Sequence, residues 1–412
     1  MPKVLLTGII GPFDNIQFDI AGDRLSRDQD IFTLKSHFHY QALHFLAENL
    51  AAECVVLEHP DPEDLREELK KGYDFVGVNF TLVNIGTMMD MCELIRETAP
   101  ETKIVLGGYG TSCFTTIFKG EEEILKLADY ICHGEGVSFM RKLTGEPLDA
   151  PLKQVIGPTG ASDLVWRDPH PGGTGGFVVS GLGCPNMCEF CCTSYYYGGE
   201  FIEIATAEGM FEGMKRIYRR ESEGRHPLMV CGDAESRQSI AVFDENLYKD
   251  KDKVARLGEL IRQDDEFGLG VINYFSFGTI EDLSRYDVVE DLVMNGVGSI
   301  WIGVESLYSD LKKRQGRDPR EVFEDLHAHG ITTTGSWIGG WDFHDKKNIE
   351  EDLEYFISCS PTQSQLFPLF PPPGTGLYER LVTEGRMPDI SLARRYFGRT
   401  SGAQPVVDQL FE

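Results

Sequence analysis

Three cysteines within one short segment are the residues of this sequence best suited to chemistry. Cys184, Cys188 and Cys191 are separated by three and by two residues. Thiolates are the ligands of iron–sulfur clusters, and these spacings allow one short loop to bind three corners of a cubane. The fourth iron then has no protein ligand, and an open coordination position is typical of a catalytic metal centre. The segment therefore predicts a catalytic 4Fe–4S cluster.

A zinc-stabilised binding module is the main alternative for such a segment. Structural zinc sites usually contain two Cys-x2-Cys pairs, and the sequence has no second pair. Cys192 falls outside the pattern and is interpreted as an inert neighbour or a spare thiol. The other cysteines have mostly apolar neighbours and are interpreted as small buried side chains: Cys54, Cys92, Cys113, Cys132, Cys231 and Cys359.

The composition limits the classes of protein to which the chain can belong. Its 412 residues are enough for two or three domains, and its formal charge of −27 disfavours binding to nucleic acid or to an anionic membrane surface. No apolar run reaches the roughly 18 residues that span a bilayer. Residues 1–8 predict a core strand and not a signal peptide, so we expect a cytoplasmic protein without membrane insertion.

The front part of the chain alternates strand-like and helix-like segments. Strands are predicted at 3–7, 55–57, 75–80, 103–106 and 130–132, and helices at 40–50, 62–71 and 88–98. This alternation predicts an α/β domain with a doubly wound parallel sheet over residues 1–144, which binds its ligand at the carboxyl ends of the strands. Residues 145–175 are rich in Pro and Gly and lack hydrophobic periodicity, which predicts a linker.

A second series of strand and helix patterns begins after this linker. Strands are predicted at 177–180, 239–243, 270–276, 299–303, 332–338 and 365–370. About six strand–helix units predict a partial (β/α)6 TIM-like barrel over residues 176–385, with the active site at the carboxyl ends of its strands. Residues 386–412 are expected to form a short C-terminal extension.

The cysteine segment resembles the signature of the radical S-adenosylmethionine superfamily, down to Phe190 before the last cysteine. The resemblance implies that the open iron binds S-adenosylmethionine and that one electron cleaves its sulfonium to give a 5′-deoxyadenosyl radical. Segments 242–246, 300–306 and 370–378 are similar to segments of the subclass that has an N-terminal cobalamin-binding domain, although Glu245 replaces an Asp.

The same resemblance places two carboxylates near the cosubstrate. By position, Asp244 and Glu305 are expected to hydrogen-bond the amino group or the ribose of S-adenosylmethionine. In the alternative interpretation these carboxylates cap the helices that follow them. The segment Cys231–Glu235 is a further candidate contact. The sequence identifies no catalytic side chain.

The front domain resembles the cobalamin-binding domain of this subclass. The resemblance assigns Asn79, Gly107, Gly108 and Thr111 to the cofactor, and segment 129–136 is also similar to its counterpart there. The pair of glycines has a physical role in that fold, because backbone without a Cβ atom can approach the nucleotide loop of cobalamin closely.

One departure concerns the cobalt ligand. Many cobalamin proteins supply a histidine from an Asp-x-His-x-x-Gly segment after the first strand, and residues 8–50 contain no such segment. The same letters occur at 168–173, in the predicted linker, where we interpret them as a coincidence. His37, His39 and His44 are candidates without a pattern. We therefore expect cobalamin without a protein histidine; the alternative is a domain that kept the fold and lost the cofactor.

With cobalamin bound, the resemblance implies methylation of an unactivated carbon of a small, natural-product-like substrate, with an external flavodoxin- or ferredoxin-like reductant. Cyclisation or rearrangement by the same parts is the alternative reaction. A non-catalytic iron–sulfur or cobalamin carrier is the alternative from another class, and its cluster needs a fourth ligand such as Cys192 or Cys231. Tyr195–Tyr197, Trp337 and Trp341 are expected either in an apolar substrate pocket or in the core.

Overall fold

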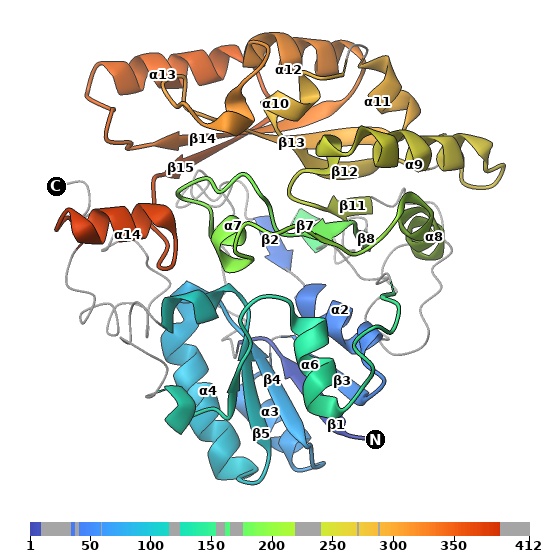
Figure 1. The fold of residues 1–412 in the computed structure, drawn as a ribbon, viewed down its shortest axis with the longest axis vertical. Coiled ribbons are helices and arrows are strands. Elements are labelled where there is room, and N and C mark those ends of the chain that lie inside the picture. The colour runs from blue at the N-terminus through green and yellow to red at the C-terminus, as the bar shows by residue number, and fades with distance from the viewer. Residues whose placement is uncertain are drawn as a thin grey trace.

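The chain folds into two parallel β-sheets, each covered by helices, that follow one another along the sequence (Figure 1). The computed structural model describes residues 1–9, 34–37, 41–58, 60–114, 124–153, 161–164, 176–218, 240–269, 272–286 and 289–387. The arrangement confirms the predicted α/β class, with a doubly wound sheet followed by a partial barrel. None of the helices in these ranges is long and apolar enough to cross a bilayer.

The first sheet has five parallel strands in the order β3-β1-β4-β5-β6. The strands are β1 (Lys3–Thr7), β3 (Glu53–Leu57), β4 (Phe75–Asn79), β5 (Lys103–Gly107) and β6 (Tyr130–Ile131). The strand order reverses between β1 and β4. Doubly wound sheets bind ligands at such a reversal, outside the carboxyl ends of the strands.

Helices cover both faces of this sheet. On one face lie α3 (Pro62–Leu69) and α4 (Ile85–Thr98), and on the other α2 (Gln41–Asn49) and α6 (Gly136–Thr144). Leu5 packs on the first face, and Val4 and Leu6 pack on the second. Burial on both faces explains the uninterrupted apolar run at the start of the chain, because a strand covered on both sides needs no polar alternation.

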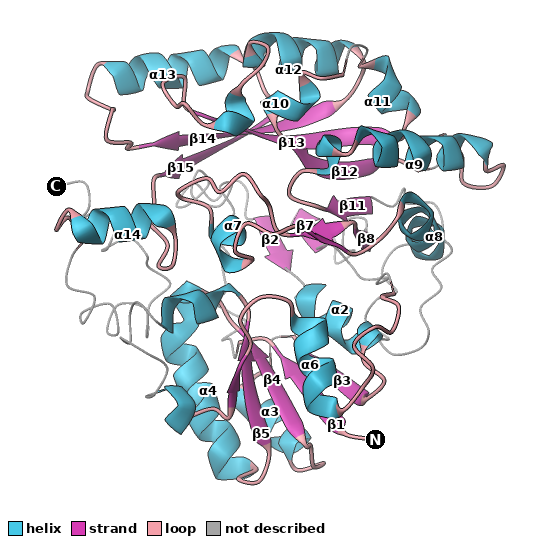
Figure 2. Ribbon diagram, viewed as in Figure 1, coloured by secondary structure: helices cyan, strands magenta, loops and turns pink. Residues whose placement is uncertain are grey.

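The second sheet has six parallel strands in the order β15-β14-β13-β12-β11-β8. The strands are β8 (Gly176–Val179), β11 (Ile240–Phe243), β12 (Tyr274–Gly278), β13 (Val297–Glu305), β14 (Thr332–Gly339) and β15 (Gln363–Pro368). Helices that accompany them are α8 (Ala207–Tyr218), α9 (Lys251–Gln263), α10 (Ile280–Leu283), α11 (Glu290–Met294), α12 (Pro319–Ala328) and α13 (Asn348–Ser358) (Figure 2). The strands follow their order in the sequence, as in a barrel, and β8 and β15 are the edges among the described strands.

Alternate residues of the second sheet face opposite sides. Ile300 and Ile302 are fully buried in the large core beneath the helices. Trp301 lies between them in β13 and Phe277 is its neighbour in β12; both are half-buried and line an internal cavity. The inner side of the partial barrel is therefore open to a ligand, whereas the outer side is closed by helices.

Part of the predicted linker forms regular structure that was not expected. Residues 161–164 form strand β7 (Ala161–Leu164), which pairs antiparallel with β2 (Leu34–His37). A strand of four residues is too short for hydrophobic alternation to reveal it, and its partner lies far away in the sequence. An antiparallel pair of short strands, β9 (Gly181–Leu182) and β10 (Ile202–Glu203), was missed for the same reason. The domain boundaries at 144/145, 175/176 and 385/386 stay predictions.

The carboxylate of Asp352, in α13, holds three segments together behind β14. Its Oδ1 atom accepts the backbone N–H of Leu307 at 2.6 Å, and its Oδ2 atom accepts the indole N–H of Trp337 at 3.1 Å. The Nε2 atom of His344 lies 2.9 Å from the same Oδ2 atom. Asp352 is fully buried. Removing its carboxylate would therefore leave buried donors without an acceptor, at a cost of about 1–3 kcal/mol for each.

We expect Asp352→Leu to lower the free energy of unfolding by at least about 3 kcal/mol, measured by urea titration followed by tryptophan fluorescence. Glu354 lies on the exposed side of the same helix, so Glu354→Leu is the matched control and should change stability by less than about 0.5 kcal/mol. Equal losses in the two variants would show that the carboxylate does not hold these segments.

Candidate functional site

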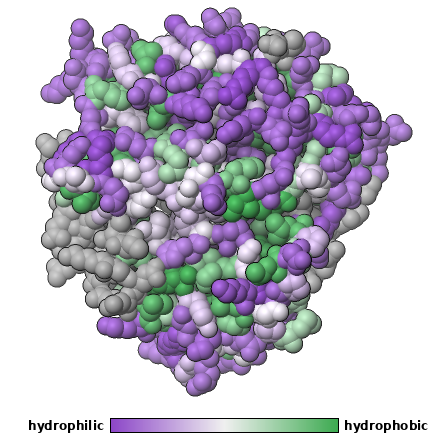
Figure 3. All heavy atoms as spheres, viewed as in Figure 1, coloured by the Kyte–Doolittle hydropathy of each residue, from purple (hydrophilic) through white to green (hydrophobic). Residues whose placement is uncertain are grey.

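A cavity of about 690 Å³ lies between the two sheets and is lined by both. Its front wall includes Asn79 and Gly107, the last residues of β4 and β5, and its barrel wall includes Glu305, the last residue of β13. On the visible face of the molecule, apolar residues gather across the middle band, between the more polar upper and lower parts (Figure 3). The carboxyl ends of the two parallel sheets therefore open into one shared space.

The cysteine segment forms a loop on the barrel side of this cavity. Cys184, Cys188 and Cys191 all line it, and the backbone N–H of Cys191 donates to the carbonyl of Cys188 at 2.9 Å. Gly183, before the first cysteine, has φ +86°, and a Cβ atom there would lie 2.2 Å from the carbonyl oxygen of Glu200. Only glycine allows this approach, so the glycine positions the loop against the chain that returns through β10.

Cys184 and Cys188 lie in an environment that opposes ionisation. Burial raises the pKa of Cys188 to about 11; Lys313 opposes this shift and the Cys191 thiol adds to it. Burial also raises the pKa of Cys184. A bound metal centre would supply the positive charge that keeps such thiols ionised at neutral pH, and so the donor set fits a cluster.

No three His, Cys, Asp or Glu side chains in the described ranges form a preassembled site for one metal ion. The cluster role of the three cysteines stays a prediction.

Glu305 is held in an unusual backbone conformation at the edge of the cavity. Its φ is +61°, a left-handed value that costs a non-glycine residue about 1 kcal/mol or more. The residue is 4% exposed. Its Oε1 atom pairs with the ammonium of Lys313, and its Oε2 atom has no hydrogen-bond partner among the described residues. A Cβ atom on Gly303 would lie 2.2 Å from Oε1, so that glycine leaves room for the carboxylate. The Oε2 atom is thus the carboxylate oxygen whose hydrogen-bonding capacity no described residue uses.

Asp244 directly follows β11, and its carboxylate is already used in a hydrogen bond with the backbone. One carboxylate oxygen accepts the backbone N–H of Asn246 at 2.9 Å, and burial raises the pKa of the side chain. The next residue, Glu245, also lines the cavity. Burial raises its pKa to about 7, and its Oε2 atom has no hydrogen-bond partner in the described part of the chain. Asp244 thus supports the local turn, and Glu245 presents the freer carboxyl group.

Glu245 and Lys313 were not predicted as site residues. Lys313 stands in the run Lys312-Lys313-Arg314, which is typical of a solvated surface. Its position in the cavity depends on the fold of a short 3-10 helix, η7 (Lys312–Arg314), beside β13. Glu245 had a weak signal, because it stands where the related subclass has an acidic residue.

On the front wall, the two predicted glycines differ in what they do. Gly108 has φ +93°, and a Cβ atom there would lie 2.1 Å from the Oδ1 atom of Asn79 and 2.7 Å from the carbonyl oxygen of Phe80. A Cβ atom on Gly107 would meet nothing closer than the Cβ atom of Cys132 at 3.9 Å. Gly108 is therefore required by the turn itself, whereas Gly107 leaves space in the cavity wall.

Thr111 does not line the cavity with these residues. It is fully buried, and its hydroxyl donates to the carbonyl of Gly108 at 3.0 Å and lies 3.3 Å from the carbonyl of Cys132. Thr111 does not contact the cavity. It stabilises the turn at Gly108, which lines the cavity. Its position near the site was predicted, and its role is a supporting one.

The cavity also extends along one face of the first sheet. Leu6 of β1, Gly77 of β4 and Val105 of β5 line it from the sheet, and Leu46 of α2 and Met140 of α6 line it from the helices. A slot between a sheet and two helices is suited to an elongated group that enters from the carboxyl edge. We use the name tail slot for these five residues.

Of the histidines considered as cobalt ligands, His44 has a described side chain, and it does not line the cavity. His44 is 6% exposed, and its Nε2 atom lies 3.0 Å from the Oε1 atom of Glu58. The side chain of His37, all of His39, segment 168–173 and segment 231–235 lie outside the described residues.

The aromatic candidates divide between the cavity and the core. Tyr196 and Tyr197 line the cavity. Trp337 donates its indole N–H to Asp352, and Trp341 donates its own to the carbonyl of Ile338 at 2.8 Å, so both are packing residues. Of the alternatives for the tryptophans, the structure thus favours the core. Trp301, which was not predicted as a pocket residue, does line the cavity.

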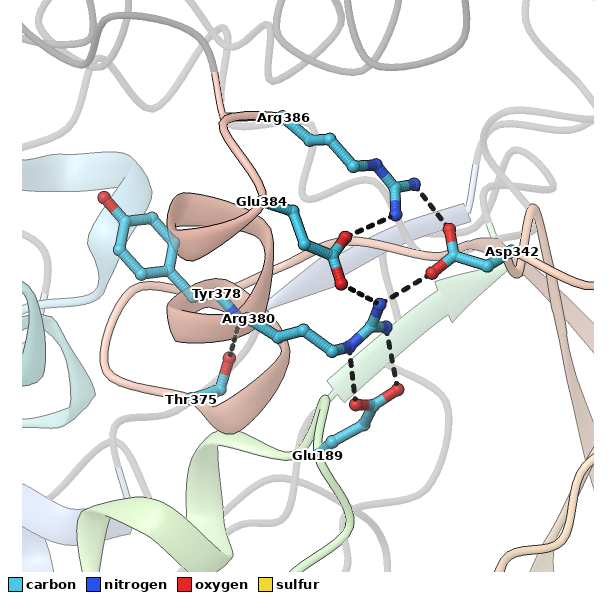
Figure 4. A network of polar contacts seen from close by, with 7 residues as sticks. All are labelled: Glu189, Asp342, Thr375, Tyr378, Arg380, Glu384 and Arg386. Atoms are coloured by element: carbon cyan, nitrogen blue, oxygen red, sulfur yellow. Dashed lines mark hydrogen bonds and ion pairs between the residues drawn. The ribbon is translucent and has the colours of Figure 1, made fainter.

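A network of ion pairs ties the last described helix to the cysteine loop (Figure 4). Arg380, in α14 (Gly376–Thr383), donates two bonds of 3.2 Å to the carboxylate of Glu189, which stands between the second and third cysteines. It also donates to Asp342 at 2.7 Å, and Arg386 pairs with Asp342 and with Glu384. Arg386 and then Arg380 hold the pKa of Asp342 at about 2. The helix therefore fixes the outer side of the loop.

We expect Gly108→Ala to destabilise the protein by about 3 kcal/mol, because the added Cβ atom meets Asn79 and Phe80 in a left-handed backbone. Gly107→Ala is the matched control and should fold with a loss below about 1 kcal/mol. Thermal unfolding of both variants measures the difference. An equal melting temperature for the two would contradict the assigned geometry of the turn.

Neither a family model nor a curated protein matches the chain. Its structure matches two solved structures of the radical S-adenosylmethionine methyltransferase TsrM from Kitasatospora setae. The one with cobalamin and a 4Fe–4S cluster bound has a TM-score of 0.66 and 13% identity, over 94% of this chain and 75% of that chain. The one with tryptophan substrate and the analogue aza-SAM bound has a TM-score of 0.65 and 14% identity, over 94% and 77%. The chain therefore has the fold of this methyltransferase.

Proposed function

We propose that the chain is a cobalamin-dependent radical S-adenosylmethionine enzyme that methylates a carbon of a small molecule. One observation carries the proposal: a single cavity brings together the three cysteines, the free carboxylate oxygen of Glu305 and the turn at Gly107. The likeness to a methyltransferase with both cofactors bound supports the same combination here.

On the barrel side, the residues fit a cluster and its cosubstrate. Cys184, Cys188 and Cys191 would hold the cluster, which supplies the electron for cleavage of S-adenosylmethionine when bound. The Oε2 atom of Glu305 would accept a hydrogen bond from the ammonium group of the cosubstrate, because a buried carboxylate oxygen without a donor is costly to leave unpaired. Asp244, already engaged by Asn246, would then help through the turn that it holds.

On the front side, the residues fit an elongated cofactor with a bulky ring. Gly107 leaves room in the wall, Gly108 and Thr111 fix the turn beside it, and Asn79 borders the same space. The tail slot would receive the nucleotide tail of cobalamin, which supplies a carrier for the methyl group when bound. His44 is engaged by Glu58, and we propose that the cobalt takes no ligand from it.

The inner wall of the barrel supports an apolar or aromatic substrate. Phe243, Phe277 and Trp301 form a row across β11, β12 and β13, with ring centroids 6.3 Å and 5.7 Å apart. All three are half-buried and line the cavity. Aromatic surface that stays accessible inside a cavity is typical of a binding site for apolar ligands. The matched methyltransferase was solved with tryptophan as substrate, so tryptophan is a rational first probe.

The first experiment is anaerobic purification with iron and sulfide reconstitution after growth with cobalamin. We expect about four irons and one cobalt per chain, and cleavage of S-adenosylmethionine once a low-potential reductant of the flavodoxin or ferredoxin type is supplied. Iron without cobalt would remove the methyl-transfer part of the proposal and leave the radical chemistry. Zinc without iron would overturn the proposal and favour a zinc-stabilised module.

Two adjacent cysteines provide a matched pair of variants. We expect Cys191→Ser to lose the cluster absorbance and all cleavage of S-adenosylmethionine, because three thiolates are the minimum set for this site. Cys192→Ser should keep both, since Cys192 is the first residue of α7 (Cys192–Tyr196) and does not line the cavity. Loss of the cluster in Cys192→Ser as well would point to a fully ligated cluster and therefore to a carrier.

Methyl transfer is separated from the other radical reactions by its stoichiometry. A methylating enzyme consumes two molecules of S-adenosylmethionine for each product, whereas a cyclase or rearrangement enzyme consumes one or none. Mass spectrometry of tryptophan and of related aromatic compounds after turnover measures both the added methyl group and the spent cosubstrate. An altered ring skeleton without an added methyl group would favour cyclisation or rearrangement.

A further inference from the structure

Lys313 carries a charge that faces the cysteine loop. Its ammonium pairs with the Oε1 atom of Glu305 and lies 5.1 Å from the centroid of the Phe190 ring, in a cation–π contact. The side chain is 17% exposed and lines the cavity together with Cys188 and Cys191. The contacts with the Glu305 carboxylate and the Phe190 ring, together with burial, give this long side chain a defined position.

The charges around Lys313 keep it ionised. Burial alone would lower its pKa, but the Glu305 carboxylate, followed by Cys188, outweighs this, so the pKa is raised. In return, Lys313 lowers the pKa of the Cys188 thiol. The lysine and the second cysteine therefore interact electrostatically, and both line the same cavity.

The backbone around Lys313 is anchored on both sides. Leu311 packs in the cluster that contains Trp341 and Phe190. On the other side, the guanidinium of Arg314 lies 5.7 Å from the centroid of the Tyr355 ring. Lys313 therefore reaches the cavity from a fixed base, and it cannot leave its place without disturbing its neighbours.

We propose that Lys313 is a positioning residue that turns Glu305 toward the cosubstrate and raises the reduction potential of the cluster; this inference rests on the proposed function. Because Lys313 occupies Oε1, the other carboxylate oxygen, Oε2, is the one left for the ammonium of S-adenosylmethionine. Reduction adds one negative charge to the cluster, and a nearby cation stabilises the reduced form.

The test compares Lys313→Met with Lys312→Met in the reconstituted full-length protein. Lys312 is adjacent and exposed, so the control removes the same charge outside the cavity. At a fixed potential, we expect the ratio of reduced to oxidised cluster to fall about tenfold in Lys313→Met. This corresponds to a reduction potential that is lower by about 59 mV for one electron. The ratio should stay unchanged in Lys312→Met. A potentiometric titration followed by electron paramagnetic resonance measures it.

Two further variants separate charge from structure. Lys313→Arg should restore most of the potential, because it restores the charge. Glu305→Gln removes a negative charge and should move the potential in the opposite direction to Lys313→Met. Binding of S-adenosylmethionine is measured by the change that it causes in the resonance spectrum. The affinity should fall about tenfold or more, or about 1.4 kcal/mol, in Lys313→Met and in Glu305→Gln. It should stay unchanged in Lys312→Met.

The outcomes distinguish this inference from the function on which it rests. A wild-type protein that binds no 4Fe–4S cluster would overturn the proposed function and the role of Lys313 with it. A wild-type cluster that cleaves S-adenosylmethionine, with the same potential and affinity in Lys313→Met as in Lys312→Met, overturns only the role of Lys313. Shifts of equal sign in Lys313→Met and Glu305→Gln also overturn it, because a charge effect requires opposite signs.

Discussion

The candidate site depends on an ion pair that is withdrawn from water. Glu305 and Lys313 would each be costly to bury alone, and their pairing is what makes the position tolerable. The pair requires Glu305 to adopt a strained backbone, and the surroundings hold that strain in place. Gly303 gives the carboxylate room, and Asp352 fixes the backbone N–H of Leu307, two residues further on. The buried contacts of Asp352, on the helix side of the second sheet, thus help to orient the Glu305 carboxylate on the cavity side.

Polar contacts between the two halves surround the cavity. The hydroxyl of Thr193 lies 3.3 Å from that of Tyr109, and the hydroxyl of Tyr196 donates to the carbonyl of Cys132 at 3.4 Å. Thr193 and Tyr196 belong to α7, which begins directly after Cys191, and Tyr109 directly follows the glycine pair. The cysteine loop and the glycine turn are therefore joined through one short helix. A shift in the backbone of the cysteine loop would therefore displace the glycine turn, and the reverse also holds, because closely packed segments transmit strain.

The sequence predicted those parts of the fold in which burial leaves a pattern. The six barrel strands and the five front strands were predicted within a few residues of their observed positions. In the front sheet, strands covered on both faces have continuous apolar runs, as β1 does. The β2–β7 and β9–β10 pairs have two to four residues per strand and leave no such pattern. The cysteines and Glu305 were predicted as site residues from their motifs, and the structure places them at the same cavity. Lys313 could not be predicted, because it stands in a basic run that is typical of an exposed surface. Only the tertiary fold places it at the cavity.

The architecture explains why so few residues are needed to build a site of this size. In a parallel sheet, every strand delivers its last residue to the same edge. Asn79 ends β4, Gly107 ends β5 and Glu305 ends β13, while Asp244 follows β11 directly. Because the two sheets direct these edges toward one cavity, residues far apart in the sequence meet without long loops. The chain can thus bring a cluster loop, a carboxylate and a glycine turn into one space by orienting two sheets, and the chemistry is then decided by single residues at strand ends.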